Sequence, residues 1–122
     1  MDRQRSDRPI WGVPVTEDLL KLMVRRIVSD VDPFKIILFG SRARGDAKPD
    51  SDVDVVVIES GGFADGRSRI KEAARLYRVL ADVKVCKDIL VYSEEDVEYW
   101  KDSLNYVLAR ALREGTVLYE RP

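Results

Sequence analysis

Histidine is absent from this chain of 122 residues, and Cys86 is its only cysteine. Without histidine, the chain cannot contain a serine–histidine–aspartate triad, a histidine-ligated zinc site or a histidine general base. A single cysteine cannot form an internal disulfide, which fits a reducing compartment, so we expect the protein in the cytoplasm. Any acid–base or metal chemistry must therefore rest on carboxylates.

Long apolar runs and an excess of positive charge are also missing. No stretch approaches the roughly 20 apolar residues needed to cross a bilayer, and no apolar segment of a signal peptide follows the polar start MDRQRSDRP. We therefore expect no membrane association. The net charge of −1 argues against strong, unspecific binding to nucleic acid. Hydrophobic residues make up 45% and charged residues 35% of the chain, which is typical of one globular domain.

The pattern of apolar residues predicts one α/β (α+β) domain over residues 15–122, in which helices cover a small mixed sheet. A flexible N-terminal arm is predicted over residues 1–14. Helices are predicted from about residue 16 to Asp32-Pro33, over 66–81, from Ser93, and through 104–112, and strands over 35–39, 53–58, 88–92 and 116–119. In the helix over 66–81, the predicted apolar face consists of Ile70, Ala73, Ala74, Tyr77 and Leu80. Cys86 is predicted to be a buried, passive thiol.

Two aspartates, Asp52 and Asp54, stand at the start of the second predicted strand. Side chains at positions i and i+2 of a strand project from the same face. Two such carboxylates repel each other, and the pKa of one rises unless a cation lies between them. Magnesium suits this arrangement because it prefers oxygen ligands. The alternative is that Asp52 belongs to a turn with residues 50 and 51 while Asp54 points into solvent.

A third carboxylate, Asp88, opens the predicted strand DILVY. A small sheet could place it beside Asp52 and Asp54, and three carboxylates on adjacent strands can hold two metal ions about 3.5–4 Å apart. The alternative is a polar residue that merely begins a strand.

The Gly40-Ser41 turn follows the first predicted strand. Such a turn offers free backbone N–H groups, and glycine lets a phosphate approach closely. Arg42 and Arg44 flank the turn, and each is either a ligand of a triphosphate oxygen or a solvated surface residue. One face of the 66–81 helix carries basic residues, which either contact a phosphate tail or an acidic partner, or are simply solvated. These residues are Arg67, Lys71, Arg75 and Arg78.

Taken together, Gly40-Ser41, ten intervening residues and Asp52-Val53-Asp54 resemble the signature of the DNA polymerase β nucleotidyltransferase superfamily. The flanking LFGSRARGDA and PDSDVDVVV are most similar to its smallest members, the minimal nucleotidyltransferase (MNT) domains. The similarity extends from the helix at Thr16 to the closing LREGTVLYE. It implies the palm-like fold of polymerase β.

The resemblance also implies a role for each residue of the motif. Gly40 and Ser41 would contact the β- and γ-phosphates of the nucleotide, which the family leads us to expect to be ATP. Arg42 is a further candidate nucleotide ligand through its guanidinium, independently of the resemblance. Asp52 and Asp54 would bind two Mg²⁺ ions. Asp88 would complete the ligand set of the ion that activates the acceptor hydroxyl, and would help to take its proton.

Stand-alone members of this family are commonly paired with a HEPN-domain toxin, so the resemblance implies transfer of AMP to a hydroxyl of that toxin. Two alternatives remain open. The acceptor could be a small molecule such as an aminoglycoside, or the protein could be a non-catalytic antitoxin that neutralises its partner by binding. The sequence leaves the oligomeric state open between a homo-oligomer and a hetero-oligomer with the partner.

Overall fold

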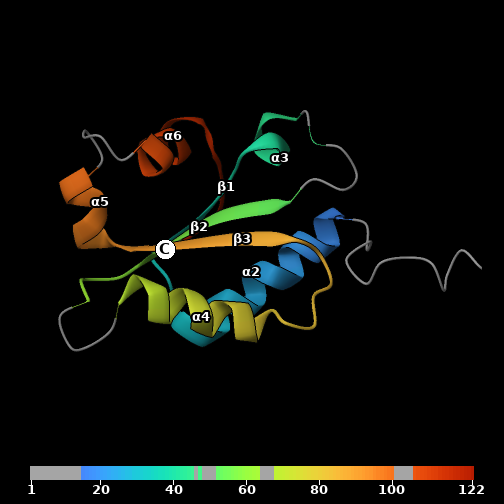
Figure 1. Ribbon diagram of the computed structural model, residues 1–122, viewed down its shortest axis with the longest axis horizontal. Coiled ribbons are helices and arrows are strands. Elements are labelled where there is room, and N and C mark those ends of the chain that lie inside the picture. Colours follow the sequence, from blue (N-terminus) through green and yellow to red (C-terminus); the bar gives the residue numbers. More distant parts are fainter. Residues whose placement is uncertain (1–14, 46, 48–51, 64–67, 101–105) are drawn as a thin grey trace, which may run out of the picture.

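The computed structural model of the chain is built around a four-stranded sheet that carries helices on both of its faces (Figure 1). It describes residues 15–45, 47, 52–63, 68–100 and 106–122, so the predicted arm over 1–14 lies outside the described residues. Within that part of the chain, none of the helices combines the length and the apolar character that a membrane crossing requires.

The sheet has the strand order β3-β2-β1-β4. Its strands are β1 (Lys35–Phe39), β2 (Val53–Glu59), β3 (Lys87–Ser93) and β4 (Thr116–Glu120). β1 runs antiparallel to β2 and β4, whereas β2 and β3 are parallel and are connected through helix α4 (Arg69–Val79). The predicted mixed sheet with helical cover is therefore confirmed.

Two apolar cores lie on the two faces of the sheet. Successive β2 residues alternate between them, since Val55 packs in the core under α2 and α4, and Val56 packs in the core with α6. Figure 1 shows α2 and α4 together on one side of the sheet, and α5 and α6 on the other. These two faces are called the α2/α4 face and the α5/α6 face below.

Helix α2 (Glu17–Val31) begins and ends where the sequence predicts. The Thr16 hydroxyl oxygen accepts a hydrogen bond from the Leu19 N–H at 3.1 Å, which satisfies one of the free donors of the first turn. Asp32 ends the helix in the left-handed conformation, with φ of 46°.

Helix α5 (Glu94–Trp100) begins with a capping box at Ser93, the residue from which the sequence predicts a helix. The Asp96 N–H donates to the Ser93 hydroxyl, and the Ser93 N–H donates to the Asp96 carboxylate, each at 3.0 Å.

Helix α6 (Tyr106–Glu114) ends just before Gly115, two residues beyond the predicted end at residue 112, and β4 follows at once. A Cβ on Gly115 would lie only 2.6 Å from the Ala111 carbonyl oxygen and 2.8 Å from that of Leu38. Only glycine therefore lets the chain pass this close to β1.

The predicted apolar face of α4 is confirmed only in part. Leu80 is fully buried and Ala73 packs against the α2/α4 core, but the prediction is wrong for Ile70, Ala74 and Tyr77. Ile70 is 82% exposed and Tyr77 is 38% exposed, while Leu76 and Leu80 are fully buried. Ala74 is exposed as well. Leu76 joins Ala73 and Leu80 on the inward face instead, because packing against the sheet buries its large apolar side chain.

The prediction that Cys86 is buried is also wrong, because its thiol is exposed. Cys86 lies just before β3, where alternate residues face the core. Val83 and Val85 occupy the inward positions, with 4% and 2% of their surfaces exposed, so Cys86 faces outward.

Candidate active site

The sheet brings two of the three predicted acidic residues side by side. Asp54 is the second residue of β2, and Asp88 is its register partner on the parallel strand β3. Paired strands lie about 4.8 Å apart, so the two carboxylates leave neighbouring backbones. Because Asp54 alternates with Val53 and Val55, which belong to the α2/α4 core, its side chain belongs to the α5/α6 face.

Asp52 lies one residue before β2 begins, and its side chain is exposed. It is therefore not a strand residue, although its charge still acts on Asp54. Asp54 itself is partly buried, which disagrees with the alternative in which it points freely into solvent. The turn proposed in that alternative involves residues 50 and 51, which lie outside the described part of the chain.

The three carboxylates form an anionic site around Asp54. The pKa of Asp54 is raised, first because burial disfavours its charged form, and then because the charges of Asp88 and Asp52 repel it. The charges of Arg42 and Arg44 lower the pKa of the same group and so oppose this shift. Both arginines of the Gly40-Ser41 region thus lie within electrostatic range of the carboxylates.

These residues fit a hard divalent cation by their chemistry. All three side chains offer oxygen, which Mg²⁺ prefers, and a dication would relieve the repulsion that raises the pKa of Asp54. Among the residues that the structure describes, no group of three or more acidic, cysteine or histidine side chains is already arranged to hold a metal ion.

Gly40 lies directly against Asp54. Its φ of 75° and ψ of −155° suit glycine, and it is the N-cap of the short helix α3 (Ser41–Arg44). A Cβ at Gly40 would lie 2.5 Å from the Asp54 carboxylate oxygen Oδ2. The register explains this proximity, since Phe39 at the end of β1 pairs with Asp54. The two halves of the motif, separated in the sequence, thus meet in the fold.

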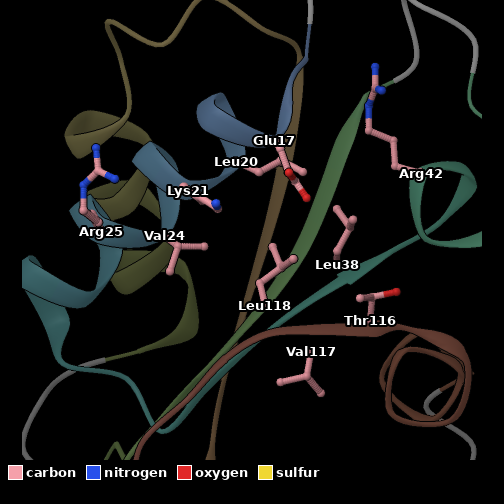
Figure 2. A pocket seen from close by; sticks show the side chains of 10 residues that line it. All are labelled: Glu17, Leu20, Lys21, Val24, Arg25, Leu38, Arg42, Thr116, Val117 and Leu118. Atoms are coloured by element: carbon pink, nitrogen blue, oxygen red, sulfur yellow. The ribbon is translucent and has the colours of Figure 1, made fainter.

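A cavity of about 620 Å³ opens between α2 and the β1–β4 side of the sheet. Figure 2 shows its α2 residues on one side, its strand residues on the other, and Arg42 arriving from α3. Its lining consists of Glu17, Leu20, Lys21, Val24, Arg25, Leu38, Arg42, Thr116, Val117 and Leu118. Leu38 and Leu118 belong to the α2/α4 core, so the cavity lies on the face opposite Asp54. Arg42 is the lining residue whose charge also acts on Asp54.

Sequence reasoning missed one residue beside the carboxylates. The hydroxyl oxygen of Tyr77 on α4 accepts a hydrogen bond from the Ile89 N–H at 2.9 Å and lies 3.5 Å from the Asp88 oxygen Oδ1, to which it donates. No local motif marks this tyrosine, because the contact depends on how α4 packs against β3.

The basic face of α4 is partly structural. Arg75 donates to the Asp30 carboxylate on α2 at 2.7 Å and to the Asp30 carbonyl oxygen at 3.0 Å, so it ties the two helices together. Lys71 and Arg78 are exposed. Arg67 lies outside the described residues.

Comparison with known proteins agrees with this geometry. A family model described as a nucleotidyltransferase domain matches residues 20–115. A search of curated proteins finds no significant match to the chain.

Several solved structures share the fold. One is a Sulfolobus solfataricus protein provisionally described as a nucleotidyltransferase, with 23% identity, a TM-score of 0.56, and coverage of 85% of this chain and 79% of that one. A second is a toxin–antitoxin complex with AMP-PNP, with 22% identity, a TM-score of 0.50, and coverage of 83% and 73%. A third is a mutant of the toxin–antitoxin pair MntA–HpeT, with 17% identity, a TM-score of 0.51, and coverage of 88% and 75%.

Proposed function

Because the chain belongs to the nucleotidyltransferase domain family, we propose that it is a magnesium-dependent enzyme that transfers AMP from ATP to a hydroxyl group of a partner protein. One observation supports this more than any other. The register places Asp54 beside Asp88, and the same residue fills the space that a side chain at Gly40 would need. The Gly40-Ser41 turn and the carboxylates therefore lie together, which supports a single site in which the turn would bind phosphate.

Each residue has a role in the proposed reaction. Asp52, Asp54 and Asp88 would hold two magnesium ions, which supply positive charge to the triphosphate and increase the acidity of the acceptor hydroxyl. The Gly40-Ser41 turn would bind the β- and γ-phosphates through backbone N–H groups and the Ser41 hydroxyl. Arg42 would add a guanidinium to the same phosphates.

Proton transfer would be the task of Asp88. One of its carboxylate oxygens would accept the proton of the acceptor hydroxyl as that oxygen attacks the α-phosphorus, and pyrophosphate would leave. Beyond this step, the chain contributes mainly by positioning the reactants and by electrostatics. No histidine is needed, which agrees with the composition.

The structural neighbours support a protein partner. Two of them are toxin–antitoxin proteins, one of which holds AMP-PNP, an analogue of ATP. The mutant of the other replaces two aspartates by glutamate, two positions apart, which is the spacing of Asp52 and Asp54. We propose that the partner is a HEPN-domain toxin and that ATP is the nucleotide.

The proposal is tested by the intact mass of the neighbouring gene's product, the proposed HEPN toxin, measured before and after incubation with this chain, ATP and Mg²⁺. We expect the toxin to gain one or more AMP units with the wild-type chain and none with Asp54→Asn. Asp82→Asn changes an aspartate on the exposed segment after α4 and is the control that should keep full activity.

Two results would replace the proposal by one of its alternatives. If the Asp52→Asn/Asp54→Asn double variant neutralised the toxin as well as the wild type does, the protein would act by binding alone. Nucleotide transfer to an aminoglycoside, with no mass gain on the toxin, would identify a small-molecule enzyme.

A further inference from the structure

Tyr77 occupies an unusual position for a large aromatic residue of a packed helix. Its surface is 38% exposed, although Leu76 beside it is fully buried. Its ring therefore contributes less to the core than its size allows, while its hydroxyl makes two contacts with β3. These contacts, rather than apolar packing, distinguish the residue.

The hydrogen bonds at the Tyr77 hydroxyl have a defined direction. β3 is an edge strand, so every second backbone N–H points away from β2. The outward N–H of Ile89 donates to the Tyr77 oxygen at 2.9 Å and occupies an acceptor site of that oxygen. The phenolic proton is then available for the Asp88 oxygen Oδ1 at 3.5 Å, a long contact of the kind that shortens when a ligand binds.

We propose that Tyr77 is a positioning residue that fixes the orientation of Asp88 at the nucleotidyl-transfer site. Asp88 stands near the start of an edge strand with an exposed side chain, so its carboxylate would otherwise rotate freely. The Tyr77 hydroxyl donates a hydrogen bond to one carboxylate oxygen of Asp88 and leaves the other oxygen for metal binding and proton transfer. The Ile89 N–H donates to the Tyr77 hydroxyl, so Tyr77 links the Asp88 carboxylate to the backbone of β3, the strand that carries Asp88.

This inference rests on the proposed function, because it assigns Asp88 to the metal site. It also makes a claim that does not depend on activity. In the metal-free protein, the Tyr77 hydroxyl should protect the Ile89 amide, and Tyr77→Phe should speed the hydrogen exchange of that amide specifically. Equal exchange in both proteins would overturn the contact on which the inference depends.

The main experiment is a titration with Mn²⁺, followed by electron paramagnetic resonance, in the presence of AMP-PNP. Tyr77→Phe should bind Mn²⁺ about tenfold more weakly than the wild type, the scale expected for the loss of a side chain that orients a metal ligand. Tyr119→Phe is the matched control, because it removes a hydroxyl from β4, the opposite edge strand of the sheet. That variant should bind like the wild type.

A double substitution separates positioning from a general structural effect. In the Asp88→Asn background, Tyr77→Phe should cause no further loss of Mn²⁺ affinity, because the ligand that it orients is already gone. An equal loss in both backgrounds, or no loss in either, would overturn the inference. Wild-type protein that binds Mn²⁺ but transfers no AMP would refute the proposed function and leave Tyr77 as the positioner of a metal ligand. Wild-type protein that binds no Mn²⁺ would overturn both.

Discussion

Gly40 is the residue at which the backbone and the acidic site constrain each other. Its φ of 75° and ψ of −155° fall in a region reserved for glycine, and the Asp54 carboxylate occupies the space next to its Cα. A side chain at Gly40 would therefore strain the turn and push Asp54 away from its partners.

We predict that Gly40→Ala lowers the stability of the fold by about 1–3 kcal/mol and abolishes AMP transfer. Gly45→Ala is a matched control, because Gly45 also has a positive φ, of 83°, but nothing within 4 Å of a Cβ. It should lose stability through backbone strain and keep its activity. Thermal unfolding and the mass assay measure the two effects, and equal activity in both variants would contradict the role of the contact with Asp54.

The repulsion among the carboxylates predicts that a substitution at Asp54 stabilises the protein, whereas Gly40→Ala destabilises it. Asp54→Asn should raise the melting temperature of the metal-free protein at neutral pH by a few degrees, because it removes a charge that burial, Asp88 and Asp52 all disfavour. The fold raises the pKa of Asp54, so the ionised carboxyl reduces stability above that pKa. The gain should therefore shrink as the pH falls through the raised pKa towards the ordinary aspartate value.

Asp82→Asn provides the comparison for this experiment. A hydrogen bond from Arg26 lowers the pKa of Asp82, so the charge on this aspartate is favoured in the fold. Its loss should reduce stability slightly or not at all, because the pair is exposed to solvent. A melting temperature in EDTA that rises equally in both variants would argue against crowding at Asp54.

At the scale of elements, the features that depend on neighbouring residues could be predicted from the sequence. The helices begin at Thr16 and Ser93 as predicted, since a hydroxyl at each start and a backbone N–H three residues later are brought together by the helix itself. The inward face of α4 could not be predicted in this way. Ala73 and Leu80 could be joined on the inward face either by Ile70 and Tyr77 or by Leu76, and the sheet against which α4 packs decides for Leu76.

The corrected face of α4 can be tested with two truncations. Leu76→Ala removes a fully buried side chain from the core under α2 and α4, and should destabilise the protein by about 2–5 kcal/mol. Ile70→Ala should change stability by no more than about 0.5 kcal/mol, because Ile70 is 82% exposed. Chemical denaturation measures both, and the reverse order would restore the face predicted from the sequence.

For the whole molecule, the sheet topology assembles the candidate site. The motif spacing predicted Gly40, Ser41, Asp52 and Asp54 as site residues, and the polar residue at a strand start predicted Asp88. The strand order and the parallel pairing of β2 with β3 could not be predicted from the sequence, yet they place Asp88 beside Asp54. Tyr77 escaped prediction for the same reason, because it reaches the site from a helix that packs only once this topology forms.

If the three carboxylates and the Gly40-Ser41 turn form one metal–nucleotide site, ligand binding must stabilise the whole fold. AMP-PNP with Mg²⁺ at about 100 times its dissociation constant should add about 2.7 kcal/mol to the free energy of unfolding. Chelation with EDTA should remove this gain, because repulsion among the carboxylates returns once the cation is gone.

Asp52→Asn should lose most of the gain as well. Its exposed position before β2 makes it a fair test, since the substitution leaves the core intact. Asp82→Asn should keep the full shift in melting temperature. A shift that survives in Asp52→Asn or in EDTA would show that the nucleotide is held elsewhere, and the cavity between α2 and β4 would then be the next place to look.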